Sequence, residues 1–165
     1  MRLALTAFLC LVGTSALAGE CDRWDASMQE DEGGPVMTAM ICAKTNSSEP
    51  EAQNLLLVQC ASEGSLWMRY IPYASPDNYP PGGDQSYNTE IEFSLDQEMF
   101  TEKAQYEDMD GAMAMSTTSD SKLISVMMAQ KQVILSDVND KAPGATFTLN
   151  GARQALETII KACGK

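Results

Sequence analysis

The cysteines are the side chains of this chain with the most evident chemistry. Five are present, Cys10 among them, and histidine is absent altogether. Without imidazole, the chain has neither a Ser-His-Asp or Cys-His nucleophile nor a histidine metal site. The other cysteines form no CxxC motif, which favours structural disulfides over zinc binding or thiol chemistry. These four are Cys21, Cys42, Cys60 and Cys163.

Two short motifs suggest catalysis or metal binding, but each has a simpler interpretation. Ser119 and Lys122 satisfy the S-x-x-K spacing in which a lysine activates a serine nucleophile. The companion K-T-G motif is missing, so we interpret Ser119 as a loop residue beside a helix cap. The carboxylates before Asp110-Gly111 suggest part of a calcium loop, but the later ligand positions do not fit, and Asp-Gly is typical of a tight hairpin turn. We therefore predict that the chain is not an enzyme and needs no cofactor.

Methionine offers a chemistry that needs no histidine. Thioether sulfur is a soft ligand for copper(I), and an exported copper carrier without histidine would have to rely on it. Methionine also fills irregular protein cores, and core packing is the simpler explanation. A copper(I) carrier is our alternative hypothesis for the function. Its ligands would be Met113, Met115, Met127 and Met128.

A group of aromatic residues gives the strongest indication of a binding surface. The group covers a predicted strand and the long loop of residues 72–88 after it, which prolines would stiffen. Tyrosine and tryptophan provide large amphipathic contacts at modest entropic cost, as at protein and sugar binding sites. The competing interpretation places Trp67 and Tyr70 in the core. The predicted surface consists of Trp67, Arg69, Tyr70, Tyr73, Tyr79 and Tyr87.

The N-terminal segment determines the compartment in which these residues must act. Residues 1–18 combine Arg2, an apolar stretch and the small-residue site Ala16-Leu17-Ala18, as in a secretory signal. The apolar stretch is well short of the roughly twenty residues of a membrane-spanning helix, and Glu20 does not fit a lipoprotein box. We therefore predict cleavage after Ala18 and a single exported domain, residues 19–165, in the periplasm or the medium.

Export has a direct consequence for the cysteines. Cleavage removes Cys10 and leaves an even number, which in an oxidising compartment predicts two disulfides with three possible connectivities. If residues 36–43 and 54–60 form a simple hairpin, Cys42 and Cys60 lie out of register, too far apart for a bond. We therefore favour Cys21–Cys42 together with Cys60–Cys163.

The charge of the chain restricts its partners. Without Arg2, ten basic residues stand against 23 acidic ones, a formal charge of −13. Nucleic acid and anionic lipid are poor partners for such a chain, whereas a basic protein would be attracted to it. No later segment approaches the apolar length of a spanning helix, so we expect no membrane span after cleavage.

Hydrophobic periodicity places these residues on an α+β framework. A polar loop is predicted for residues 19–35, a short helix capped by Asp120 near residues 121–130, and a C-terminal helix capped by Asn150 at residues 151–163. Strands are predicted at residues 36–43, 54–60, 66–71, 89–95, 99–108, 112–117, 133–138 and 145–149. We expect a mainly antiparallel β meander or sandwich with these two short helices and two disulfides.

Four segments of this framework also carry a family resemblance. They contain Leu57-Val58-Gln59-Cys60, the strand around Arg69, the T-F-T-L-N-G run of residues 146–151, and Ala162-Cys163. In these segments the chain resembles small bacterial periplasmic proteins, among them type VI secretion-associated accessory proteins. The resemblance implies a compact, mostly β exported domain with an accessory or binding role and no catalytic residues. The sequence departs from the pattern after Arg69, where an acidic continuation is expected.

These observations together predict a periplasmic or secreted binding protein. We expect it to contact another envelope protein through the aromatic surface, and a basic partner suits its charge. Association with a secretion system follows only from the resemblance.

Overall fold

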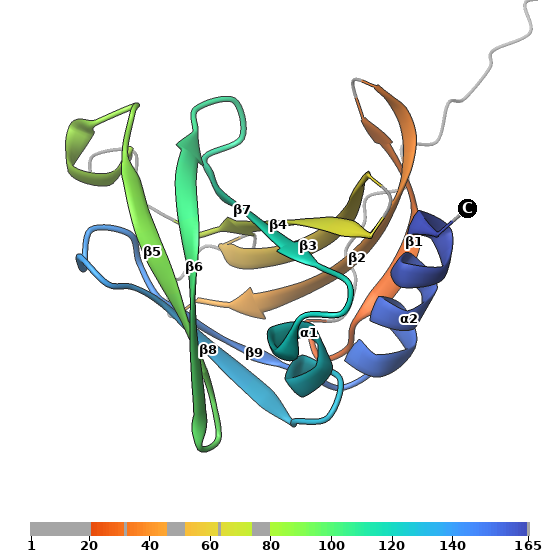
Figure 1. Ribbon diagram of the computed structural model, residues 1–165. Helices are drawn as coiled ribbons and strands as arrows, with labels where there is room; N and C mark the ends of the chain where they lie inside the picture. The colour runs from red at the N-terminus through yellow and green to blue at the C-terminus, as the bar shows by residue number, and fades with distance from the viewer. Residues whose placement is uncertain (1–20, 32, 46–51, 63, 74–79, 165) are drawn as a thin grey trace, which may run out of the picture.

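The chain is organised around one antiparallel sheet. The computed structural model describes residues 21–31, 33–45, 52–62, 64–73 and 80–164, and the predicted signal segment lies outside them. Within these residues the strand order is β1-β2-β3-β4-β7-β6-β5-β8-β9 (Figure 1). The strands are β1 Asp25–Asp31, β2 Gly34–Lys44, β3 Gln53–Ser62, β4 Ser65–Ile71, β5 Asn88–Leu95, β6 Glu98–Glu107, β7 Ala112–Thr118, β8 Gln132–Asp137 and β9 Ala145–Thr148. The helices are α1 Lys122–Met127 and α2 Ala152–Cys163, with a 3-10 turn at Pro81–Gly83.

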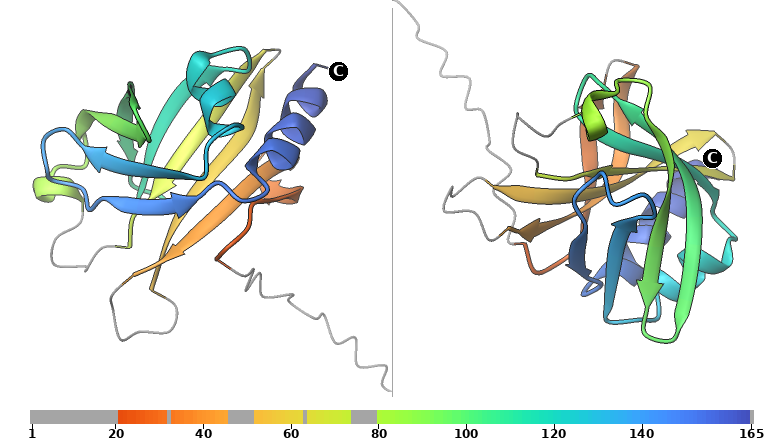
Figure 2. Two further views of the ribbon diagram at one scale, coloured as in Figure 1. Left: turned by 90° about the horizontal axis from the view of Figure 1, so that it is seen from below. Right: turned by 90° about the vertical axis from the view of Figure 1, so that its left-hand side faces the viewer.

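The sheet curls strongly, so that its two ends come near each other (Figures 1 and 2). One face of each central strand lines the inside of this curve, as the fully buried Leu56, Val58 and Met68 show. Both helices add their apolar residues to the same core, and α2 packs across β1, β2 and β3. The inside of the curve is therefore filled by side chains.

Trp24, which directly precedes β1, bonds to the end of β9 and to a residue that follows it. Its indole Nε1 donates to the carbonyl of Thr148 at 2.9 Å, and its backbone N–H donates to the carbonyl of Asn150 at 2.8 Å. The side chain is 3% exposed. Next to it, Gly151 has a φ of +81°, and a Cβ there would lie 3.1 Å from the carbonyl oxygen of Trp24. Glycine at position 151 therefore allows the two ends to meet closely.

Two disulfides reinforce this arrangement and confirm the predicted connectivity. Cys21–Cys42 joins the segment before β1 to β2, with 4.6 Å between the Cα atoms. Cys60–Cys163 joins β3 to the last residue of α2, with 5.4 Å between the Cα atoms. The second bond therefore holds the C-terminal helix against the sheet.

The predicted fold class and most predicted elements are confirmed, with three corrections. Residues 25–31 form β1 and not part of a polar loop. This strand is mostly polar and mostly exposed or half-buried, and it exists because it pairs with β2 from Asp25 opposite Met40 to Asp31 opposite Gly34. The caps also differ: Ser121, not Asp120, accepts from the backbone of α1, and Gly151, not Asn150, precedes α2.

In the described part of the chain, neither helix combines the length and the apolar character needed to cross a membrane.

The two disulfides are expected to contribute unequally to stability. Cys60–Cys163 closes a separation of 103 residues and Cys21–Cys42 one of 21. If loop entropy dominates, replacing both cysteines of a pair by serine lowers the free energy of unfolding by about 5 kcal/mol for the first bond and about 3 kcal/mol for the second. Urea denaturation of the two double variants measures the difference. A larger loss for the Cys21–Cys42 variant would contradict this account.

Candidate binding surface

Strand β4 presents one row of side chains to the core and the opposite row to the outside. Leu66, Met68 and Tyr70 are fully buried, whereas Trp67 is 53% exposed. This is the alternation that the sequence predicts for a strand with one covered face. The outward row consists of Trp67, Arg69 and Ile71.

Two of the predicted surface tyrosines belong to the core instead. The ring of Tyr70 meets Phe147 edge to face at a centroid distance of 6.0 Å, and its hydroxyl donates to the carbonyl of Pro143 at 2.5 Å. Tyr87 is also buried, and its hydroxyl donates to the carboxylate of Asp137 at 2.7 Å. Each tyrosine therefore satisfies its hydroxyl internally and is not available for contact with a partner.

Tyr87 is part of a hydrogen-bond network centred on Asp137. Its buried carboxylate accepts from Tyr87, from the hydroxyl of Thr89 at 2.5 Å, and from the backbone N–H groups of residues 139, 141 and 142 at 2.9 to 3.0 Å. Burial alone would raise the pKa of Asp137, but these hydrogen bonds outweigh it and lower the pKa to about 2. The network ties the loop after β8 to the start of β5.

The remaining predicted tyrosines contribute little to a described surface. Tyr73 is half-buried, and its backbone N–H donates to the side-chain carbonyl of Asn54 at 2.8 Å. Tyr79 lies outside the described residues. Of the six residues predicted for one surface, the structure keeps Trp67 and Arg69 together on the outer face of β4.

The outer face around these two residues is largely apolar. Leu57 lies opposite Arg69 on β4 and opposite Met40 on β2, while Leu55 lies opposite Ile71. All four of these apolar side chains are half-buried. We call this set the Trp67 face, and it consists of Met40, Leu55, Leu57, Trp67, Arg69 and Ile71.

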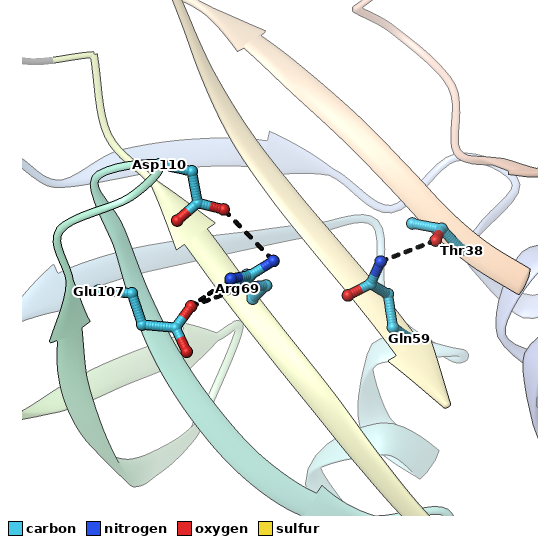
Figure 3. A network of polar contacts seen from close by, with 5 residues as sticks. All are labelled: Thr38, Gln59, Arg69, Glu107 and Asp110. Carbon is cyan, nitrogen blue, oxygen red and sulfur yellow. Dashed lines mark hydrogen bonds and ion pairs between the residues drawn. The ribbon is translucent and has the colours of Figure 1, made fainter. Parts of the chain in front are cut away.

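Arg69 is held in this face by carboxylates (Figure 3). Its Nε donates to Glu107 Oε2 at 2.9 Å, a second guanidinium nitrogen contacts the same oxygen, and Nη1 lies 3.3 Å from Asp110 Oδ2. Burial alone would lower the pKa of Arg69. The hydrogen bond to Glu107 and the charges of Asp110, Glu107 and Asp31 outweigh burial and raise the pKa. The face therefore contains a fixed cation surrounded by acids.

A second polar contact lies on the same side of the sheet, one position further along the strands. The side-chain amide of Gln59 donates to the hydroxyl of Thr38 at 3.0 Å, and both residues are buried (Figure 3). Gln59 lies directly opposite Trp67. Because Gln59 donates to Thr38, neither side chain is left as an unpaired buried polar group beside the apolar residues.

A shallow hollow borders the Trp67 face. It has a volume of about 210 Å³ and lies where β4 meets β7 and β6. Its walls include Trp67, Arg69, Gln105, Glu107 and Ser116. An indole face beside an arginine is a combination enriched where proteins bind one another.

The methionines of the alternative hypothesis do not form an accessible ligand set. Met113, Met115 and Met127 are buried in the hydrophobic core, and Met128 packs against it. A copper ion could reach these thioethers only by displacing core packing. Among the described residues no group of three or more cysteine, aspartate or glutamate side chains is placed to hold a metal ion.

Sequence reasoning identified Trp67 and Arg69 but missed their neighbours Met40, Leu55 and Leu57. The continuous apolar run from Leu55 to Val58 is typical of a strand covered on both faces, so the sequence alone does not assign its outward members to a surface. They could have been found by pairing the predicted strands and noting which alternate residues then lie on the same face of the sheet as Trp67.

Comparison with known proteins finds a protein of similar fold but does not assign the chain to a family. No protein-family description matches the chain, and no curated protein does. Among solved structures, the chain is similar to invasion associated protein B from Bartonella henselae, with a TM-score of 0.57 and 14% sequence identity. The similarity covers 89% of this chain and 97% of that one. The two proteins therefore share an architecture.

Replacing Asp137 by asparagine is expected to remove a pH-dependent part of the stability. A folded-state pKa of about 2 against an ordinary value of 3.8 means that the ionised carboxylate stabilises the fold above about pH 4, by about 2 kcal/mol. This contribution declines as the pH falls from 4 towards 2.

Urea denaturation of wild type and Asp137→Asn from pH 7 to pH 2 measures the effect. The difference in free energy of unfolding should shrink as the pH falls below 4. If the difference in free energy of unfolding between the two proteins does not change with pH, the charge of the carboxylate does not contribute to stability.

Proposed function

We propose that this protein is an exported, non-enzymatic accessory protein that binds another envelope protein through the Trp67 face. Its partner is basic. The single observation on which the proposal rests is the exposed Trp67, which lies among half-buried apolar side chains and beside an ion-paired arginine. Tryptophan and arginine surrounded by apolar contacts are enriched where proteins bind one another.

Several features support an exported location. The N-terminal segment has the charged start, apolar stretch and small-residue site of a secretory signal. The two disulfides are the kind of cross-link that persists in an oxidising compartment. A similar fold occurs in a protein described as invasion associated, a name that is compatible with an accessory role.

The electrostatics of the Trp67 face favour a basic partner. Glu107 and Asp110 both contact Arg69, and Asp31 acts on it through its charge, so the carboxylates outnumber the cation. The whole chain has a formal charge of −12. Long-range attraction would therefore speed association with a positively charged surface, and the apolar residues would supply the close contact.

The structure offers no second function with comparable support. The copper(I) hypothesis would require ligands that pack in the core. The association with type VI secretion stays a prediction from the quoted residues, and the proposal does not depend on it.

The proposal predicts that Trp67 is required for capture of the partner. A photoreactive amino acid at position 57, beside Arg69 on the Trp67 face, should cross-link a discrete basic envelope protein that mass spectrometry can identify. With that partner purified, Trp67→Ala should weaken binding at least tenfold in a biosensor assay, and added salt should weaken wild-type binding.

Ile134→Ala provides the matched control. Ile134 is also an exposed apolar residue, 43% exposed, but it lies on β8 and outside the Trp67 face. Its replacement should leave the affinity unchanged. Equal binding by wild type and Trp67→Ala would rule out the Trp67 face as the contact.

A further inference from the structure

The lower half of β6 has a backbone edge that no described strand covers. β6 runs from Glu98 to Glu107, but β7 pairs with it only from Ala104 to Glu107. Figure 1 shows β7 turning away from β6 below this point. Residues Glu98–Lys103 therefore pair with β5 on one side only, and we call this segment the β6 edge.

The hydrogen-bond alternation identifies which backbone groups point outward from the β6 edge. The N–H of Tyr106 donates to the carbonyl of Tyr87 at 2.9 Å, so the even-numbered residues of β6 bond to the β5 side. In an antiparallel ladder the intervening residues direct both backbone groups to the other side. At the β6 edge these residues are Met99, Thr101 and Lys103, and all three are exposed. The carbonyl of Lys103 closes the β6–β7 ladder beside the Ala104–Met115 pair, so at Lys103 only the N–H is left to point outward.

A hollow already exists where β6 and β7 separate. It has a volume of about 860 Å³, and its walls include Thr101, Lys103 and Ser116. It shares Gln105 and Ser116 with the hollow beside Trp67. A chain lying along the β6 edge would therefore lead directly to the Trp67 face.

The side chains around the β6 edge are predominantly acidic. Glu90 and Glu92 lie on β5, Asp96 in the hairpin turn, and Glu98 and Glu102 on β6 itself, against Lys103 and Lys122. Lys122 forms an ion pair with Glu98 and lies over the ring of Phe100. None of the ion pairs among the described residues involves Glu102, and the pKa of Glu102 is raised by burial, which a hydrogen bond with Thr117 only partly offsets. A cation arriving opposite Glu102 would relieve that cost.

We propose that the β6 edge accepts an extended basic segment of the partner protein, which adds to the sheet as a further strand. Backbone hydrogen bonds to Met99, to Thr101 and to the N–H of Lys103 give this mode its affinity, and lysine or arginine opposite Glu102 gives it selectivity. The inference rests on the proposed function, because it specifies how the partner reaches the Trp67 face.

A second copy of this chain fits the β6 edge less well. Each copy has a formal charge of −12, and pairing two copies would bring their acidic edges together. Charge therefore favours a basic peptide over self-association.

The test uses a blocked nine-residue peptide in which lysine alternates with threonine. Thr101→Pro removes one outward N–H without breaking a bond to β5, because proline is tolerated where its missing donor faces away from the ladder. Calorimetry should show at least tenfold weaker binding of this peptide to Thr101→Pro than to wild type. Thr101→Val keeps the N–H and should bind within twofold of wild type, and a peptide with glutamate in place of lysine should not bind.

Hydrogen exchange provides an independent readout. On addition of the lysine peptide, the amides of Met99, Thr101 and Lys103 should become protected, as strand addition requires. Met99→Pro tests the same edge if Thr101→Pro does not fold as judged by circular dichroism. Absence of peptide binding to wild type, unchanged binding to the proline variants, unprotected amides, or a concentration-dependent dimer that uses this edge would each overturn the proposal.

The two proposals fail in different ways. If Trp67→Ala loses the cross-linked partner while Thr101→Pro retains it, strand addition is wrong and the Trp67 face stands. If Thr101→Pro loses the peptide and the partner while Trp67→Ala retains both, the β6 edge stands and the Trp67 face is wrong.

Discussion

The fold depends on the attachment of Trp24 to the last strand of the sheet. Its two hydrogen bonds to the carbonyls of Thr148 and Asn150 connect residues more than 120 positions apart. A twisted antiparallel sheet of this size tends to curl, but its two ends meet only if something links them. With the two ends joined in this way, the central strands share one core with both helices, and α2 packs across β1, β2 and β3. Cys60–Cys163 then keeps the helix there.

The polar groups inside the fold are paired with one another. Among the described residues, no buried side-chain nitrogen or oxygen lacks a hydrogen-bond partner. The buried carboxylate of Asp137, whose pKa is lowered to about 2, is surrounded by five donors that belong to the fold. On the outside, the Trp67 face presents apolar area and the β6 edge presents backbone groups. These two features are the ones on which the proposed binding function rests.

Much of the fold could be predicted because antiparallel strands leave a two-residue pattern in the sequence. The alternation in β4 puts Tyr70 on the face opposite to Trp67 and Arg69, so the predicted surface that combined all three could not lie on one face of the strand. Hairpin geometry also made a Cys42–Cys60 bond improbable, and both favoured disulfides are present. The aromatic surface was only partly predictable, since composition does not show that Tyr70 and Tyr87 find acceptors in the core.

The sequence by itself determined the fold class and most strands, because these depend on local periodicity and on short connections. It favoured the observed cysteine pairing among three possible connectivities, and it left open whether Trp67 points to the surface or into the core. Tertiary structure alone decided the pairing of β1, the meeting of Met40, Leu55 and Leu57 beside Arg69, and the separation of β6 from β7. Each of these depends on which strands become neighbours and where a twisted strand leaves its partner. Alternation tells which side a residue is on, but only the assembled sheet determines what it meets there.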